Sequence, residues 1–162
     1  MNQSHILGMS VIASLGCALL PGIVVAQSAK DLVGAWTVVS AAPSMSGPTP
    51  KGSLIFEANG RYSFQMMRSD LPKYASNNRT KGTPAEYQAT VEGSIAYFGT
   101  YSVNGTDLIL HVEGSTFPNW NGTDQKRNNL SVTADELRFT NPVPSGGAAA
   151  DSADPVIWKR AR

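Results

Sequence analysis

Alternation of apolar and polar residues, broken at short intervals by turn residues, constrains the fold of this chain more than any other feature. Side chains of an extended strand point to opposite faces in turn, so a two-residue period indicates strands with one buried face. Asn59-Gly60 and Asn104-Gly105 are typical of tight β-hairpins because such residues accept a positive φ. We expect about eight strands, over residues 32–40, 52–56, 61–68, 95–103, 106–114, 125–132, 136–141 and 156–159.

A polar stretch interrupts this alternation over residues 69–94. Within it, Thr83-Pro84-Ala85-Glu86 resembles a capping box with proline at the first helical position, which predicts a short helix over residues 84–91. A connection of about 25 residues is long for a compact domain, so the stretch is either a lid or binding loop, or a helix that decorates the surface.

These elements predict an all-β fold: an antiparallel eight-stranded barrel with one short inserted helix. Closure into a barrel removes the exposed edges of a sheet made from consecutive hairpins. A barrel of about eight strands has an interior that side chains fill or that holds one small ligand.

The first 26 residues differ from the rest of the chain. No charged residue occurs from Ile6 to Ala26, and a helix-breaking Pro21-Gly22 precedes the small-residue site Val24-Val25-Ala26. These features are typical of a cleaved secretory signal peptide, whereas a membrane anchor is the alternative because about 20 apolar residues can span a bilayer. We expect a signal peptide at 1–26, one barrel domain at 27–162, no stable membrane span after cleavage, and a secreted or periplasmic location.

Charge and motif content argue against several classes of function. The net charge of +1 gives no basic excess to bind phosphates, which argues against nucleic acid as a partner. Cys17 lies before the expected cleavage site, so the mature chain would have one histidine, His111, and no cysteine. This argues against a zinc site, because zinc is usually bound by several cysteine or histidine side chains. G-x-S-x-G, P-loop and G-x-G-x-x-G motifs do not occur in the sequence. We therefore expect no metal and no cofactor.

The Asn104-Gly105 turn predicts which side chains share a face of the sheet. As a two-residue turn, it places Phe98 directly opposite His111. The face that carries Tyr97 and Tyr101 is the more apolar, so we expect it to line the interior and His111 to lie outside. The alternative is a polar-lined cavity with His111, Glu113 and Phe98 inside.

Two side chains of the fifth predicted strand are candidates for acid–base chemistry. His111 and Glu113 are two residues apart, so their side chains point to the same face. A carboxylate beside an imidazole can move a proton near neutral pH, which makes the pair a candidate catalytic site. The alternative is a solvated pair on the face of a sheet.

Candidate ligand-binding residues follow in the next loop and strand. Trp120 either covers an apolar ligand or plugs the end of the barrel. Arg127 either binds a ligand carboxylate through two parallel hydrogen bonds, stacks on a tryptophan, or stays in water.

Several stretches of the sequence are similar to the bacterial and fungal lipocalin-like domain family. They include a G-x-W at Gly34-Ala35-Trp36 and lie at residues 32–40, 60–67, 96–101, 111–127 and 157–160, so that the resemblance extends over nearly all of the chain after residue 26. The resemblance implies a small antiparallel barrel and no settled activity. It also implies that a cluster of residues in the signature stretch 111–127 serves a common purpose, namely His111, Glu113, Trp120, Gln125 and Arg127.

Three functions remain open at this point. The first is a binding module for a small, largely apolar molecule, in which Tyr97 and Tyr101 supply apolar area and Arg127 or His111 orients one polar group. The second is an isomerase or cyclase that uses His111 with Glu113. The third is a structural barrel with a filled core. We favour the binding module over an enzyme.

Overall fold

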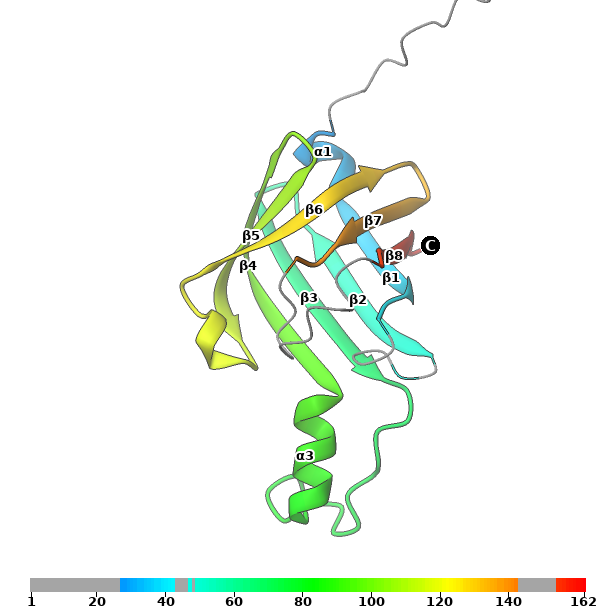
Figure 1. The fold of residues 1–162 in the computed structure, drawn as a ribbon, viewed down its shortest axis with the longest axis vertical. Coiled ribbons are helices and arrows are strands. Elements are labelled where there is room, and N and C mark those ends of the chain that lie inside the picture. The colour runs from blue at the N-terminus through cyan, green and yellow to red at the C-terminus, as the bar shows by residue number, and fades with distance from the viewer. Residues whose placement is uncertain (1–26, 43–46, 48, 143–153) are drawn as a thin grey trace, which may run out of the picture.

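The protein is a closed barrel of eight antiparallel strands, each of which pairs with its neighbours in the sequence, while β1 also pairs with β8 (Figure 1). The computed structural model describes residues 27–42, 47, 49–142 and 154–162. The predicted signal peptide lies outside the described residues. The strands are β1 (Gly34–Ser40), β2 (Pro50–Phe56), β3 (Arg61–Arg68), β4 (Ser94–Asn104), β5 (Asp107–Ser115), β6 (Asp124–Val132), β7 (Glu136–Thr140) and β8 (Val156–Arg160). The predicted barrel is therefore confirmed.

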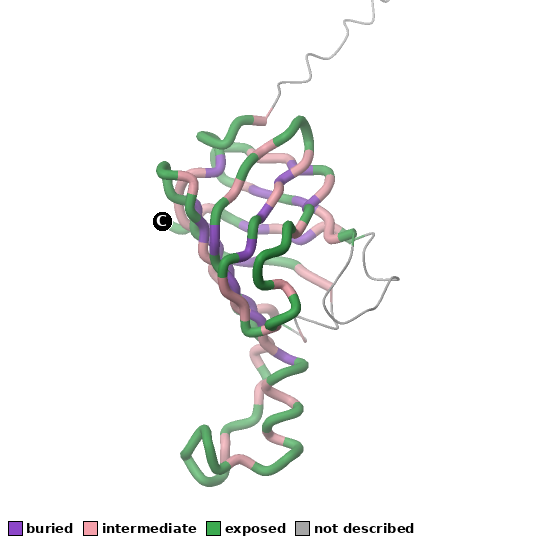
Figure 2. The backbone as a smooth tube through the Cα atoms, turned by 90° about the vertical axis from the view of Figure 1, so that its left-hand side faces the viewer, coloured by how far each residue is buried: buried purple, intermediate pink, exposed green. Residues whose placement is uncertain are grey.

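The inserted helix α3 (Pro84–Glu92) is present as predicted and projects beyond the end of the barrel (Figure 1). Thr83 and Glu86 form the expected capping box, in which the Thr83 hydroxyl accepts from the backbone N–H of Glu86. The helix has no buried residue, and the tube in Figure 2 shows its segment standing away from the barrel wall. We call the stretch over residues 69–93, which contains this helix, the arm. The arm lies on the surface and does not cover the interior of the barrel.

Alternation places the apolar side chains inside, as the purple positions along the strands of Figure 2 show. Tyr62, Phe64 and Met66 of β3 are buried, whereas Gln65 and Met67 between and after them are exposed. The same alternation holds in the neighbouring strands, so the inward side chains form one continuous apolar cluster. Its largest fully buried members are Trp36, Trp158, Phe56, Phe139, Leu32, Leu54, Leu108, Leu110, Leu137 and Val112.

A short helix that the sequence did not predict, α1 (Ala29–Leu32), lies at one end of the barrel (Figure 1). The indole N–H of Trp36 donates to the carbonyl of Leu32 at 2.8 Å, and the guanidinium of Arg160 lies 4.1 Å from the centre of the Trp36 ring. Arg160 also donates to the carbonyl of Val33 at 2.9 Å. The Trp36 and Arg160 side chains therefore fasten α1 to the first and last strands of the barrel.

The β4–β5 hairpin has a different register from the predicted one. The turn residues are Gly105 and Thr106, so Asn104 pairs with Asp107, and only Gly105 takes a positive φ, of 61°. Thr100, rather than Phe98, lies opposite His111. The predicted pairing was wrong because it assumed that both Asn104 and Gly105 occupy the turn. A two-residue shift leaves every side chain on its predicted face, so the assignment of inner and outer faces is confirmed.

A β-bulge between Phe98 and Gly99 shifts the register of the same hairpin farther from the turn. The backbone of β5 passes so close to Gly99 that a Cβ atom there would lie 1.9 Å from the carbonyl oxygen of His111. Beyond the bulge, Phe98 faces Gly114 and Tyr97 faces Ser115. The bulge therefore sets the position of Tyr97 in the barrel.

Candidate ligand-binding site in the barrel interior

Arg127 points from β6 into the barrel interior, where it is only 3% exposed. Its Nη1 donates to the carbonyl of Lys126 at 2.9 Å, and its Nη2 donates to the hydroxyl of Tyr97 at 3.2 Å. Its Nε has no hydrogen-bond partner among the described residues. Buried polar groups in folded proteins are nearly always hydrogen-bonded, so Arg127 marks an unusual position in this core.

Two tyrosine hydroxyls lie in the same region. The Tyr62 hydroxyl is buried without a partner in the described part of the chain, whereas the Tyr97 hydroxyl accepts from Arg127 and keeps its own proton free to donate. Burial raises the pKa of Tyr62 well above its usual range and also raises the pKa of Tyr97, although the nearby charge of Arg127 opposes both shifts. Both phenols therefore stay neutral at physiological pH and can act as hydrogen-bond donors.

Aromatic rings surround these donors in a continuous series of contacts. The rings of Phe64 and Tyr97 stack with centroids 4.4 Å apart, and the edge-on contact of Phe64 with Trp158 has a centroid distance of 5.4 Å. The Trp120 ring makes an edge-on contact with Tyr97, with the ring centres 5.3 Å apart. The Nε1 of Trp158 is a further buried donor without a partner among the described residues. The interior thus combines aromatic walls with hydrogen-bond donors.

Three of the predicted binding residues meet in this cluster. Trp120 belongs to a short 3₁₀ helix, η1 (Pro118–Trp120), between β5 and β6, and its ring lies 5.8 Å from the guanidinium carbon of Arg127. Trp120 is partly buried and packs against the core, and Tyr97 contacts both Trp120 and Arg127. Of the alternatives for Arg127, the contact with a tryptophan is the one present in the structure. Arg127 does not lie in solvent.

Tyr101 and Gln125 lie apart from this cluster. The Tyr101 hydroxyl donates to the carbonyls of Ala29 and Glu57, so it secures the end of the barrel that carries α1. The Gln125 side chain donates to the Thr123 hydroxyl at 3.0 Å. Both side chains thus have local partners that explain their positions without a ligand.

The alternative cavity with His111, Glu113 and Phe98 inside is wrong, because all three side chains are exposed on the outer face of the barrel. The Nδ1 of His111 lies 2.8 Å from a carboxylate oxygen of Asp124, on the adjacent strand β6. Glu113 instead accepts two hydrogen bonds from Arg61, which hold the pKa of its carboxyl below the usual range. His111 and Glu113 share a face as predicted, but each has another partner.

Tyr62, Phe64 and Trp158 belong to the site but were not predicted from the sequence. Each lies on a strand that was predicted, and each occupies an inward position of the alternation. Tyr62 and Trp158 could have been predicted as site residues, because each is an inward-facing aromatic residue that carries a polar atom. Their lack of partners, however, depends on distances between strands that are remote in the sequence.

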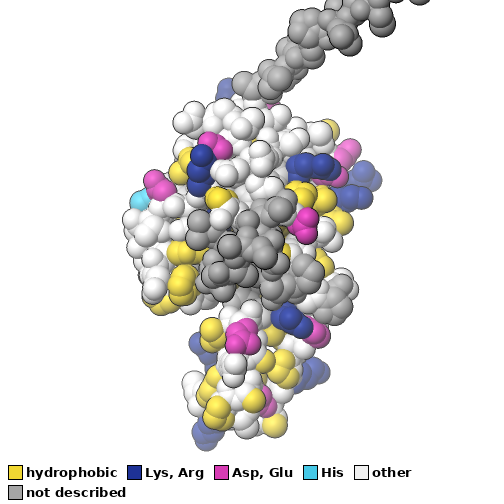
Figure 3. All heavy atoms as spheres, viewed as in Figure 1, with side chains coloured by type: hydrophobic (Ala, Val, Ile, Leu, Met, Phe, Trp, Pro, Cys, Tyr) yellow, Lys and Arg dark blue, Asp and Glu magenta, His cyan; other side chains and the backbone are white. Residues whose placement is uncertain are grey.

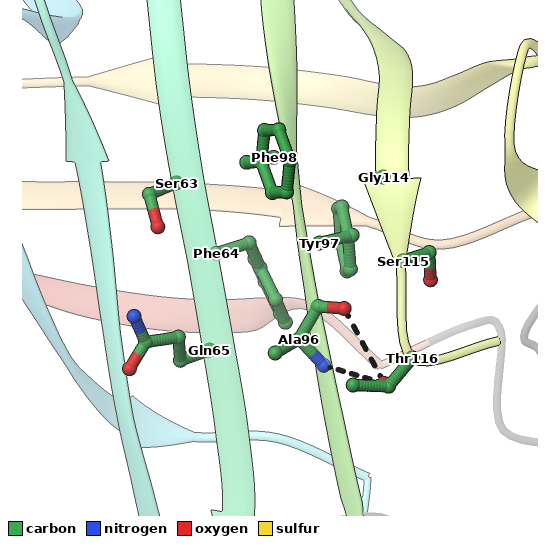
Figure 4. Close-up of a pocket in the computed structure, with 9 residues that line it drawn as sticks. All are labelled: Ser63, Phe64, Gln65, Ala96, Tyr97, Phe98, Gly114, Ser115 and Thr116. Atoms are coloured by element: carbon green, nitrogen blue, oxygen red, sulfur yellow. Dashed lines mark hydrogen bonds between the residues drawn. The ribbon is translucent and has the colours of Figure 1, made fainter.

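Two hollows open on the surface of the described part of the protein. One, of about 320 Å³, lies over β3, β4 and β5, where Figure 4 shows Phe98 and Ala96 between the side chains of the two neighbouring strands. Its lining also includes Phe64 and Tyr97 of the interior cluster. The other, of about 340 Å³, lies between the arm and the barrel and contains the ion pair of Arg68 with Asp70. Among the described residues that line them, neither hollow contains an unpaired buried charge.

The visible outer surface carries positive and negative side chains interspersed, without a large patch of one sign among the residues drawn in colour (Figure 3). Apolar side chains gather over the arm in the same view. Within the described residues, no group of three or more histidine, cysteine, aspartate or glutamate side chains is placed to hold a metal ion. In that same part of the chain, every helix is too short or too polar to cross a membrane.

Comparison with known proteins agrees with the geometry of the barrel. The family model described as a lipocalin-like domain matches residues 33–161. The chain belongs to the lipocalin-like domain family. The chain is also similar to the 4'-hydroxy-3'-methoxypropiophenone carrier protein of Aspergillus oryzae (strain ATCC 42149 / RIB 40). The two sequences are 34% identical over 106 residues, which cover 60% of this chain and 95% of that protein. The resemblance to lipocalin-like domains expected from the sequence is thus confirmed.

Proposed function

We propose that this lipocalin-like protein is a carrier that binds a small aromatic molecule with an oxygen acceptor in the barrel interior. The observation that carries the proposal is Arg127, which is buried among aromatic rings and retains an unpartnered N–H among the described residues. Aromatic walls favour a flat apolar ligand, and a few convergent donors fix its orientation. Because the free groups at Arg127, Tyr62 and Tyr97 are donors, the ligand must supply acceptors.

The relative from Aspergillus oryzae supports this class of ligand. Its name describes a carrier of an aryl ketone that has one ring, a carbonyl, a hydroxyl and a methoxy group. Such a molecule offers both an aromatic face and oxygen acceptors, which match the rings and donors around Arg127. We take this compound as the first probe for the present protein.

The two other functions are less well supported. An acid–base enzyme that uses His111 and Glu113 would have its reacting groups on the outer face, each already paired with another side chain. A purely structural barrel would be expected to satisfy its buried polar groups, yet Arg127 and Tyr62 keep atoms without partners in the described part of the chain.

Isothermal titration calorimetry of the purified protein with 4'-hydroxy-3'-methoxypropiophenone tests the proposal. We expect saturable binding with one site, and a loss of about tenfold or more in affinity for Arg127→Met. Arg138→Met is the matched control, because Arg138 lies exposed on β7 and pairs with Glu136. If wild type and Arg127→Met bind equally, or if neither this compound nor related aryl ketones bind, the interior site is not a carrier site of this class.

Native mass spectrometry of protein purified from its own host provides an independent test. A retained molecule with an aromatic ring would support the proposal, and a retained aliphatic lipid would contradict it. We also propose that the carrier acts outside the cytoplasm, for which the apolar segment Ile6 to Ala26 is the support. Fractionation of the host, with the mature N-terminus determined by sequencing, tests that location.

A further inference from the structure

The guanidinium of Arg127 is a buried positive charge without a counter-ion among the described residues. Both of its hydrogen-bond acceptors, the carbonyl of Lys126 and the hydroxyl of Tyr97, are neutral. In the part of the chain that the structure describes, no carboxylate lies within ion-pair distance of Arg127, although five ion pairs between other Arg or Lys side chains and carboxylates occur there. An ionised group in a protein interior is strongly unfavourable unless an opposite charge compensates it. The interior therefore favours an anion.

Other ionisable groups around Arg127 do not supply this negative charge. The titratable side chains that face it are Tyr62 on β3 and Tyr97 on β4, and burial raises the pKa of both, so they remain neutral. The acidic side chains and the histidine of the strands next to Arg127 point to the outer face, and these are Asp107, His111, Glu113, Asp124 and Glu136. A buried water molecule can accept from Nε of Arg127, but it carries no net charge.

We infer that the carrier takes its ligand as an anion, namely an acylphenol bound as its phenolate, with the phenolate oxygen against Arg127 and within reach of the Tyr62 hydroxyl. The inference rests on the proposed function and specifies the form of the ligand. A carbonyl group para to the hydroxyl spreads the phenolate charge through the ring to the carbonyl oxygen. An acylphenol is therefore more acidic than a tyrosine side chain, and its anion suits an aromatic pocket. The phenolic proton stays in the solvent when the anion binds.

Two ligands that differ by one methyl group test whether the protein binds the anion or the neutral molecule. The first is 4'-hydroxy-3'-methoxypropiophenone, and the second is 3',4'-dimethoxypropiophenone, which has no ionisable hydroxyl. Dissociation constants are measured for both by calorimetry, from about two pH units below the pKa of the free phenol to about one unit above it. Below that pKa, we expect the Kd of the phenol to fall by up to about tenfold for each unit by which the pH rises, because the phenolate binds far more tightly than the neutral phenol. The Kd of the ether should stay constant and exceed that of the phenol above this pKa.

Absorption spectra of the bound phenol give a second measurement that does not depend on any variant. The phenolate of an acylphenol absorbs at longer wavelength than the neutral phenol. At one pH unit below the pKa of the free phenol, about one tenth of the free ligand is ionised. We expect the bound ligand at that pH to show the phenolate band almost completely.

Substitutions of Arg127 separate its charge from its shape. Arg127→Lys retains a positive charge, so the dependence of Kd on pH should persist with weaker binding. Arg127→Gln removes the charge but retains a hydrogen-bond donor, so phenol and ether should bind with similar Kd values below the pKa of the free phenol. Above that pKa the phenol should bind this variant more weakly than the ether, because most of the free phenol is then ionised. Arg138→Gln is the matched surface control and should behave as wild type.

The outcomes distinguish this inference from the function on which it rests. Tighter binding of the phenol as the pH rises, together with a phenolate band below the pKa of the free ligand, supports the inference. A Kd of the phenol that does not fall as the pH rises toward the pKa of the free ligand, or a bound spectrum of the neutral phenol, overturns it and leaves the aromatic carrier intact. Failure of both ligands to bind overturns the carrier function as well.

Discussion

Nη2 of Arg127 lies 3.2 Å from the hydroxyl oxygen of Tyr97, so a single hydrogen bond links β6 to β4 through the interior of the barrel. This contact holds the guanidinium among aromatic rings without neutralising its charge. Under the proposed carrier function, Arg127 would contribute to ligand binding at a cost to the stability of the ligand-free protein.

Arg127→Met should therefore increase the stability of the ligand-free protein. Replacing a buried charge by an apolar side chain of similar volume is often neutral or stabilising, and we expect a gain of about 1 kcal/mol after the loss of the Tyr97 hydrogen bond. Urea denaturation followed by tryptophan fluorescence measures this change. A loss of more than about 2 kcal/mol would mean that Arg127 has a compensating partner in the protein.

Tyr62→Phe should make stability less sensitive to alkaline pH. The pKa of Tyr62 is raised in the folded state by burial, whereas an unfolded tyrosine has a pKa of about 10. The stabilisation from this difference is complete below about pH 10 and is lost as the pH rises further, because only the unfolded chain then releases its proton. Urea midpoints measured from about two pH units below that unfolded pKa to about one unit above it should decline less steeply for Tyr62→Phe than for wild type. Tyr87→Phe, at an exposed position of α3, is the control.

Gly34→Ala should destabilise the end of the barrel that carries α1. Gly34 has a φ of 130°, and a Cβ atom there would lie 2.7 Å from Nη1 of Arg160. Gly60→Ala separates the two causes, because Gly60 has a φ of 86° and a Cβ atom at that position would have no neighbour within 4 Å. We expect a loss of about 1–3 kcal/mol from backbone strain in each variant, with the larger loss for Gly34→Ala. Equal losses in thermal denaturation would show that the contact with Arg160 has no effect.

The sequence predicted the strands well because their alternation is a local property of the chain. The predicted strand over residues 61–68 agrees with β3 (Arg61–Arg68), and the helix that begins at Pro84 ends one residue later than expected. Helix α1 was missed because four residues carry no periodic signal, and it is held by contacts with Trp36 and the remote Arg160. Local pattern thus defines the elements, while their ends depend on tertiary contacts.

The candidate site could be predicted only in part from the sequence. Tyr97, Trp120 and Arg127 were identified from residue type and position, and the structure brings them together. The resemblance of the stretch 111–127 also drew attention to His111, which alternation places on the opposite face from Arg127. The unpartnered atoms of Tyr62 and Trp158 could not be predicted, because they depend on how eight strands close into a barrel.

The stretch 111–127 has side chains on both the outer and the inner face of the barrel, so two substitutions within it should have different effects on binding. Trp120→Ala removes a ring that contacts Tyr97 and lies near Arg127, and we expect it to weaken acylphenol binding about tenfold, equivalent to about 1.4 kcal/mol. His111→Ala removes an exposed contact with Asp124 and should leave the Kd unchanged, with a loss of stability below about 0.5 kcal/mol. Calorimetry at a single pH compares the two variants directly. A Kd that responds to His111→Ala but not to Trp120→Ala would place the ligand on the outer wall instead of in the barrel.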